Sequence, residues 1–195
     1  MNNDTFPKLL LHNADKLNDQ VALREKEFGI WQTVTWCEFA DHVRDFALGL
    51  HVLGLRPGDT VAIIGDNRPE WLYSELAAQS LGAKSVGIYQ DSAANEVKYI
   101  IQSSHTRLII AEDQEQVDKV LEIWDELHDI AKVIYYYPKG LRHYQEPFLA
   151  HFPDIEALGQ EYHTKHPQFF AERVAAGKAT DMRPPSDASF CHHRI

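Results

Sequence analysis

Cysteine, long apolar runs and basic residues are all scarce in this sequence, and each shortage excludes a class of protein. The two cysteines, Cys37 and Cys191, are far apart, and Cys37 lies among apolar neighbours, as a buried reduced thiol does. No run approaches the ~20 apolar residues of a membrane-spanning helix. Residues 1–13 lack the apolar core of a signal peptide. These absences predict a cytoplasmic protein.

The balance of charge excludes two further kinds of partner. The chain has 19 Lys and Arg against 29 Asp and Glu, which gives a formal net charge of -10 at neutral pH. Such a chain repels nucleic-acid phosphates and anionic lipid surfaces, so neither is the expected partner. The acids concentrate in residues 112–129, which we interpret as the solvated face of one helix.

A glycine-rich phosphate loop is also absent. The ten glycines form neither GxGxxG nor GxxxxGK, the patterns in which backbone amides close on a phosphate. Gly65-Asp66-Asn67 stands between a predicted strand and a predicted helix, so a helix N-terminus is available there to an anion. One glycine beside an aspartate is a weak motif, and we interpret it as an ordinary strand–helix turn.

Other candidate site residues are equally weak. His163 and His166 are spaced to share a helix face, but no Cys or acid at a supporting spacing completes a metal site. Cys191-His192-His193 are adjacent, and three adjacent residues rarely reach one ion together. The residue patterns therefore predict no catalytic, cofactor-binding or metal-binding residue. We expect three tryptophans to lie in the core: Trp36, Trp71 and Trp124.

Residues 55–113 organise the chain, because three short apolar runs alternate there with helical patterns. The runs are 61–64, 85–89 and 108–111, and the first and third show no polar alternation. Strands buried on both faces have this pattern, which favours a parallel sheet. Parallel strands need long crossovers, usually helices. Two segments have the right length for these crossovers, namely 69–81 and 93–104.

Further elements are predicted on both sides of this stretch. Thr35 and Glu38 fit a capping box, and Gly54 fits the C-terminus of the amphipathic helix that follows it. The other predicted elements are a helix over 5–18, hairpin strands over 21–25 and 29–36, a helix over 114–130, a strand over 132–137, irregular structure over 141–152, and a helix over 154–176 that Pro167 divides. The fold class is thus α/β, a parallel sheet with flanking helices plus an N-terminal β-hairpin.

From Asn67-Arg68-Pro69-Glu70-Trp71 outward, the sequence resembles the N-terminal part of the AMP-forming acyl-CoA synthetases, and especially the long-chain fatty-acid–CoA ligases. The resemblance covers roughly residues 5–165. It is carried by many positions in order, in the stretches GLHVLGLRPGDTVAIIGDNRPEW, ELAAQSLGAKSVGIYQDSAANEVKYIIQSS and AEDQEQVDKVLE. It implies an incomplete portion of the N-terminal domain of an adenylate-forming enzyme.

The resemblance implies a two-step reaction for the family. ATP and a fatty acid form an acyl-adenylate and pyrophosphate, with Mg, and the thiol of CoA then displaces AMP. The family's phosphate loop, its adenine, ribose and magnesium motifs and its catalytic lysine have no counterpart in this sequence. The resemblance therefore transfers no catalytic residue. We expect this chain to be inactive and to bind none of the family's cofactors by itself.

Two domains are assigned from the sequence. Residues 1–178 are the N-terminal subdomain of an AMP-binding domain, and 179–195 are an irregular tail with paired prolines. A shifted reading frame would explain the tail, and a native tail evolved for another purpose is the alternative.

Two further expectations concern binding. The alternative to a ligase portion is a stand-alone α/β module that binds a small molecule near Asp66 or Tyr89–Ser92. The resemblance also implies apolar surface that other parts of the family's fold would cover, so we expect self-association. Peripheral membrane association is an expectation for the full-length family.

Overall fold

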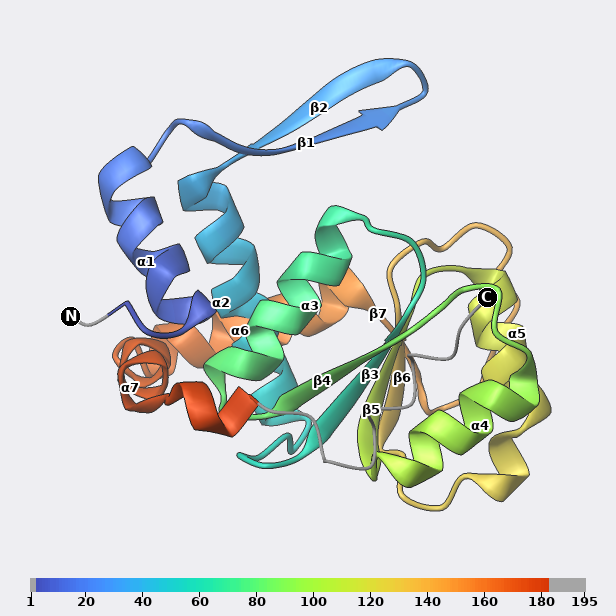
Figure 1. Cartoon of the computed structure of the whole chain (residues 1–195). Helices are drawn as coiled ribbons and strands as arrows, with labels where there is room; N and C mark the ends of the chain where they lie inside the picture. Colours follow the sequence, from blue (N-terminus) through green and yellow to red (C-terminus); the bar gives the residue numbers. More distant parts are fainter. Residues whose placement is uncertain (1–2, 183–195) are drawn as a thin grey trace, which may run out of the picture.

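The centre of the molecule is a five-stranded parallel sheet (Figure 1). It is seen in a computed structural model of the chain, which describes residues 3–182. The strand order is β4-β3-β5-β6-β7, and the strands are β3 Thr60–Ile64, β4 Lys84–Ile88, β5 Thr106–Ala111, β6 Lys132–Tyr135 and β7 Leu149–His151. The parallel sheet predicted from the sequence is confirmed.

The two central strands explain the apolar runs. Every residue of β3 is buried, and in β5 only Arg107 is exposed. Side chains of a strand point alternately to its two faces. Val61 and Ile63 therefore join the apolar cluster on one face of the sheet, while Ala62 and Ile64 join the cluster on the other. Strands covered on both faces need no polar alternation.

Helices cover both faces of this sheet (Figure 1). One face packs against α1 Phe6–Leu17, α2 Trp36–Val52, α3 Pro69–Ser80, α6 Phe152–Lys165 and α7 Phe169–Ala176. The other face packs against α4 Ala94–Ser103 and α5 Gln114–Glu122. Two short 3-10 helices complete the described chain, η1 Trp124–Glu126 and η2 Ala179–Met182. None of the helices within residues 3–182 has both the length and the apolar character needed to cross a lipid bilayer.

The predicted hairpin is confirmed and extends away from the sheet (Figure 1). It consists of β1 Val21–Glu27 and β2 Ile30–Thr35, joined through a turn at Phe28 and Gly29. This turn is shorter than predicted, because both of its residues have positive φ, 46° and 83°. Such a turn matches the twist of two antiparallel strands and lets them pair up to the last residue.

The ends of α2 follow the sequence prediction. The Thr35 hydroxyl accepts the N–H of Glu38 (3.2 Å), and the Glu38 carboxylate accepts the N–H of Thr35 (2.8 Å). At the other end, Gly54 has φ +97°. Its N–H donates to the His51 carbonyl, and the N–H of Leu55 donates to the Leu50 carbonyl. These two bonds satisfy carbonyls that the last turn of the helix leaves free.

Several boundaries differ from the prediction. The helix predicted to run to residue 130 leaves α-helical geometry after Glu122, because tertiary packing decides there: Trp124 stacks on Phe148 with ring centroids 3.5 Å apart. The N-cap of α4 is Ala93 and not Ser92, since the Glu96 carboxylate accepts the N–H of Ala93 (3.1 Å). Strand β6 ends at Tyr135, two residues early.

The predicted and the observed structure also differ in part after residue 141. The stretch 141–152 was predicted to be irregular, yet its last part forms β7, which pairs with β6 over only three residues. The predicted division of the C-terminal helix at Pro167 is confirmed. Most of the tail, residues 183–195, lies outside the described residues, and so does Cys191-His192-His193.

Helices α2 and α6 cross at unusually close range through two glycines. A methyl group at Gly159 would lie 1.7 Å from the Asp45 carbonyl oxygen, and one at Gly49 would lie 2.0 Å from the Ile155 carbonyl oxygen. Beside this contact, the rings of Phe46 and Phe152 stack with centroids 3.8 Å apart. The backbones can approach so closely only because both positions lack a side chain.

Replacing Gly159 with alanine should therefore be severely destabilising. The new methyl group meets backbone and not a side chain that could rotate away, so the two helices must separate. We expect Gly159→Ala to lower the free energy of unfolding by about 3 kcal/mol or more. Urea denaturation followed by circular dichroism measures this. Ala157→Ser, at an exposed position of the same helix, should change it by less than about 0.5 kcal/mol, and similar values for the two variants would contradict the close crossing.

Candidate functional site

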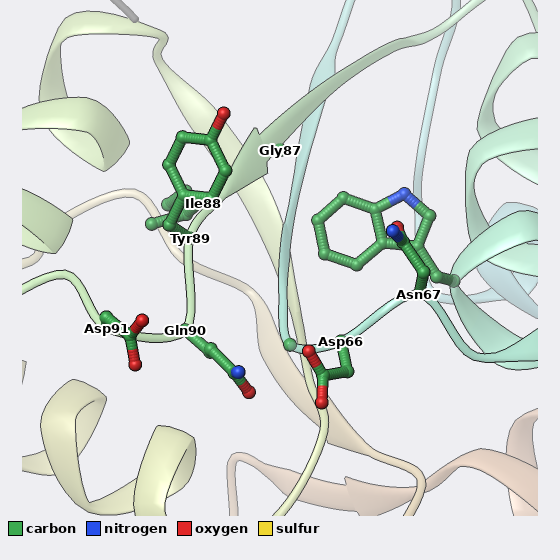
Figure 2. A pocket seen from close by; sticks show the side chains of 9 residues that line it. Asp66, Asn67, Gly87, Ile88, Tyr89, Gln90 and Asp91 are labelled. Carbon is green, nitrogen blue, oxygen red and sulfur yellow. The ribbon is translucent and has the colours of Figure 1, made fainter. Parts of the chain in front are cut away.

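A crevice opens at the carboxyl edge of the sheet, where β3 and β4 end (Figure 2). It has a volume of about 430 Å³. One wall is the loop between β3 and α3, and the other is the end of β4 with the loop that follows. Its lining residues are Gly65, Asp66, Asn67, Trp71, Gly87, Ile88, Tyr89, Gln90 and Asp91.

Gly65 lets the first wall fold tightly over the sheet edge. Its φ is +152°, and a methyl group there would lie 2.6 Å from both the Tyr136 hydroxyl and the Glu112 Cβ. These two side chains come from the residues that follow β6 and β5. Strands β3, β5 and β6 thus bring one residue each to the same point, and only glycine fits between the other two.

Glu112 fixes the loop that begins at Gly65. Its Oε2 accepts the N–H of Asp66 at 2.6 Å, and its Oε1 lies 4.0 Å from the Arg68 Nε. Burial raises the pKa of the Glu112 carboxyl above its ordinary value, and the hydrogen bond from the Asp66 N–H partly opposes this. A carboxylate from β5 therefore positions the strand–helix turn after β3.

Arg68 connects this turn to the hairpin. Its Nη2 lies 3.1 Å from the Glu25 carboxylate of β1, and its guanidinium lies 5.8 Å from the centre of the Tyr137 ring. Arg68 does not line the crevice. Its charge is shared between Glu25 and Glu112, so it stabilises the wall of the crevice and does not face a ligand within it.

Two aromatic side chains line the crevice, Trp71 from α3 and Tyr89 from the end of β4. The Trp71 indole packs on Gly87, where a methyl group would lie 3.0 Å from Cζ2. Tyr89 is 73% exposed at the mouth of the crevice. The loop after Tyr89 is held from α5, because the Lys119 ammonium donates a hydrogen bond to the Gln90 carbonyl. Figure 2 shows the side chains of Gln90 and Asp66 on facing sides of the crevice.

The polar groups of the lining determine which ligands the crevice could bind. Asp66 and Asp91 supply carboxylates, Asn67 and Gln90 supply amides, and none of the lining residues is Lys or Arg. Carboxylates accept hydrogen bonds and repel phosphates. Two aromatic rings and several acceptors fit a planar group that carries N–H or O–H donors. The described lining residues of the crevice offer no positive charge to hold a triphosphate.

The structure brings together two of the stretches singled out in the sequence. The Gly65-Asp66-Asn67 turn and residues 89–91 line the same crevice, although Ser92 does not. His163 and His166 find no third ligand, since no three His, Cys, Asp or Glu side chains gather as a metal site within residues 3–182.

The prediction for the tryptophans was wrong in part. All three pack against the apolar clusters, but each is only partly buried, and Trp71 also lines the crevice.

Sequence reasoning missed Glu112 and Tyr136 as residues of the site. A signal existed for Glu112, because it directly follows the buried run of β5 and so stands at the carboxyl edge. Tyr136 gave no such signal, because the run of tyrosines in which it lies is typical of a strand. The Tyr136 hydroxyl is buried without a hydrogen-bond partner in the described chain, and burial raises the pKa of this phenol.

Glu70, in the first turn of α3, is a second buried acid near this edge. Its Oε2 is buried and has no hydrogen-bond partner within residues 3–182. Burial is the largest influence on the Glu70 carboxyl and raises its pKa, and a hydrogen bond from the backbone of Glu70 and the nearby charge of Arg68 only partly oppose this. An ionised carboxylate at this position therefore destabilises the fold.

Replacing Glu70 with glutamine should stabilise the chain at pH 7. The amide keeps the shape and removes the charge, so we expect Glu70→Gln to raise the free energy of unfolding by about 1 kcal/mol. A raised pKa means that the wild-type penalty appears as pH rises through the folded-state pKa. The advantage of the variant should therefore shrink as the pH falls below that value.

Urea denaturation at pH 7 and pH 4.5 measures this difference. The control is Glu161→Gln, at an exposed position where hydrogen bonding to Lys165 lowers the carboxyl pKa, and it should not stabilise the chain at either pH. A Glu70→Gln variant that is less stable than wild type at pH 7 would show that the carboxylate has a favourable partner.

Sequence and structure now define the class of protein. The sequence profile of the family described as AMP-binding enzyme matches residues 10–181. The chain therefore belongs to the AMP-binding enzyme family, and the recognition made from its sequence is confirmed.

Its curated relatives include long-chain-fatty-acid–CoA ligases. ACSBG2 of Xenopus laevis is 30% identical over 132 residues, which are 68% of this chain and 18% of that protein. ACSBG1 of Homo sapiens has the same identity and coverage. ACSBG2 of Mus musculus is 31% identical over 133 residues, 68% of this chain and 20% of that protein. The chain thus spans about a fifth of the length of these relatives.

Solved structures support the fold. The acetoacetyl-CoA synthetase from Streptomyces lividans superposes with a TM-score of 0.70 at 24% identity, over 77% of this chain and 24% of that one. The anthranilate CoA ligase AuaEII, solved with anthranoyl-AMP, gives 0.69 at 22% identity, over 77% of this chain and 27% of that one. The chain therefore shares the fold of these two proteins over about three quarters of its length.

Proposed function

We propose that this chain forms part of the framework of an AMP-forming ligase for long-chain fatty acids. The reaction would join a fatty acid to CoA at the expense of ATP, through an acyl-adenylate and with Mg, and would yield acyl-CoA, AMP and pyrophosphate. Support comes from the family membership and from the names of the relatives. The framework would position loops at the carboxyl edge of the sheet, where ligands of open α/β sheets bind.

We further infer that the 195-residue chain does not catalyse this reaction alone. The observation that carries this is the lining of the crevice, which has two carboxylates and no Lys or Arg. Transfer of an adenylyl group develops negative charge, and enzymes stabilise it with oriented donors and cations. Neither the crevice nor a glycine-rich loop supplies them here. The chain would accordingly bind none of ATP, Mg or CoA tightly by itself.

Two proposals follow for the chain as a whole. Residues 1–178 would form one subdomain and residues 179–195 a tail, for which a shifted reading frame is one explanation; its first four residues form η2, so the prediction of irregular structure was wrong there. A cytoplasmic location fits the composition, and the acidic charge argues against nucleic acid as a partner.

Self-association is proposed from the exposed apolar surface near the N-terminus. Phe6 is 65% exposed, and it lines a groove between α1 and α3 together with Leu9 and Leu72. Light scattering measures the association directly.

The exchange of labelled pyrophosphate into ATP tests the inactivity. With palmitate and magnesium, the purified chain should show only the background rate, because no Lys or Arg among the described lining residues of the crevice stabilises the charge that develops during adenylyl transfer. An active acyl-CoA ligase assayed in parallel is the positive control. Exchange above background that depends on the fatty acid would overturn the inference.

A second candidate function is a small-molecule-binding module, which the shape of the crevice favours. A volume of about 430 Å³ lies in the range of ligand pockets, and Trp71 and Tyr89 offer faces for stacking. In this reading the chain would bind a planar compound with hydrogen-bond donors and would need no catalytic group.

A thermal-shift screen of planar donor compounds, starting with adenosine, tests this second function. A compound that binds in the crevice should raise the unfolding temperature of wild type, and Tyr89→Ala should reduce the affinity about tenfold or more through loss of stacking. The matched control is Tyr99→Ala, a 57% exposed tyrosine outside the crevice, which should bind like wild type. Equal loss in both variants, or no shift with any compound, would contradict a crevice-binding module.

A further inference from the structure

Three cations lie at the amino edge of the sheet, opposite the carboxyl edge that forms the crevice. The carboxyl edge holds Asp66, Asp91 and Glu112. At the amino edge, Lys84 begins β4 and Lys132 begins β6. Arg107, the second residue of β5, has the exposed side chain of that strand. These cations stand out in a chain whose net charge is -10.

The cations of the amino edge have no carboxylate partners within the described chain. Arg107 donates to the Asp129 carbonyl (3.3 Å) and Lys132 to the Pro147 carbonyl (2.6 Å). Arg173 of α7 donates to the Leu81 carbonyl (3.0 Å). The ion pairs among residues 3–182 involve other cations. Their charges are thus not neutralised by ion pairing.

Two of these cations line one concave site, here called the Lys84–Arg173 pocket. It has a volume of about 410 Å³ and lies beside the start of β4, at the opposite end of the strand from the crevice. The residues that the structure describes in its lining include no Asp or Glu: Pro57, Gly58, Gly82, Lys84, Arg173, Ala176, Gly177 and Thr180. Arg173 uses one of its five N–H donors on Leu81, which leaves others for a ligand.

The charges of Arg56 and Arg173 act together on a neighbouring side chain, His51. Burial is the main reason that the pKa of His51 is lowered, and the charges of Arg56 and Arg173 lower it further. The nearest carboxylate in the adjoining turn, Asp59, accepts the backbone N–H of Arg56 at 2.8 Å and is not part of the lining. Lys84 and Arg173 are therefore the charged side chains among the described residues that line the pocket.

We propose that the Lys84–Arg173 pocket binds a phosphate group. A lysine supplies a compact point charge and an arginine supplies a planar fork of donors, and this pair of side chains suits tetrahedral oxyanions. Its concave shape favours a small phosphate-bearing ligand over a flat protein surface. The site is separate from the carboxyl-edge crevice, so it goes beyond the proposed ligase function and does not depend on it.

Isothermal titration of inorganic phosphate into the full chain, at constant ionic strength with chloride as the exchanged anion, tests the proposal. Wild type should show saturable binding with one site. Lys84→Gln should weaken it about tenfold or more, because a charged hydrogen-bond partner is lost. Lys84 makes no side-chain hydrogen bond or ion pair among the interactions that the structure describes, so this variant should remain folded.

The matched control is Arg107→Gln, which removes an equally unpaired cation of the same edge outside the pocket and should leave phosphate affinity unchanged. Arg173→Gln should weaken binding as Lys84→Gln does, with circular dichroism to confirm that α7 is intact. Phosphatidylcholine vesicles with and without phosphatidic acid distinguish a lipid headgroup from free phosphate as the source. Saturable binding that Lys84→Gln does not weaken, or no saturable binding at all, would overturn the proposal.

Discussion

Burial of β3 and β5 on both faces is the constraint on which this structure depends. All backbone groups of a strand buried on both faces must pair with neighbouring strands, since no water reaches them. Strand β3 pairs with β4 on one side and β5 on the other. Four of its side chains belong to the two apolar clusters, so the two layers of helices pack against the same short strand.

This arrangement also decides where chemistry can occur. Chain order reverses at β3, because β4 lies on one side of it and β5 on the other, and ligands of open α/β sheets bind near such a point. Here the space at the end of β3 is occupied by Gly65, Glu112 and Tyr136. The open crevice lies beside it, at the end of β4. Among the described residues, the crevice at this edge is lined by two carboxylates and by no Lys or Arg. Because ATP and CoA are polyanions, this lining is the physical argument behind our proposal that the chain is a framework for the reaction and not its catalyst.

The sequence was most informative where local rules decide the structure. The apolar runs of β3 and β5, the box of Thr35 with Glu38 and the glycine after α2 could all be read directly. Features set by long-range contact could not. Strand β7 is short and is defined by its pairing with β6, and the approach of Gly49 to Gly159 joins two distant helices. For the same reason Tyr136 was missed, because nothing local marks it as a neighbour of Gly65. Glu112 was missed although its place directly after the run of β5 marked it.

Native-state hydrogen exchange of the 195-residue chain, followed amide by amide, tests the central role of β3 and β5 most directly. If these strands hold both layers together, their amides should be the slowest in the chain and should exchange only through global unfolding. The amides of β1 and β2, in the hairpin that extends from the body, should exchange faster through local opening. Amides of β3 that exchange as fast as those of the hairpin would contradict this account.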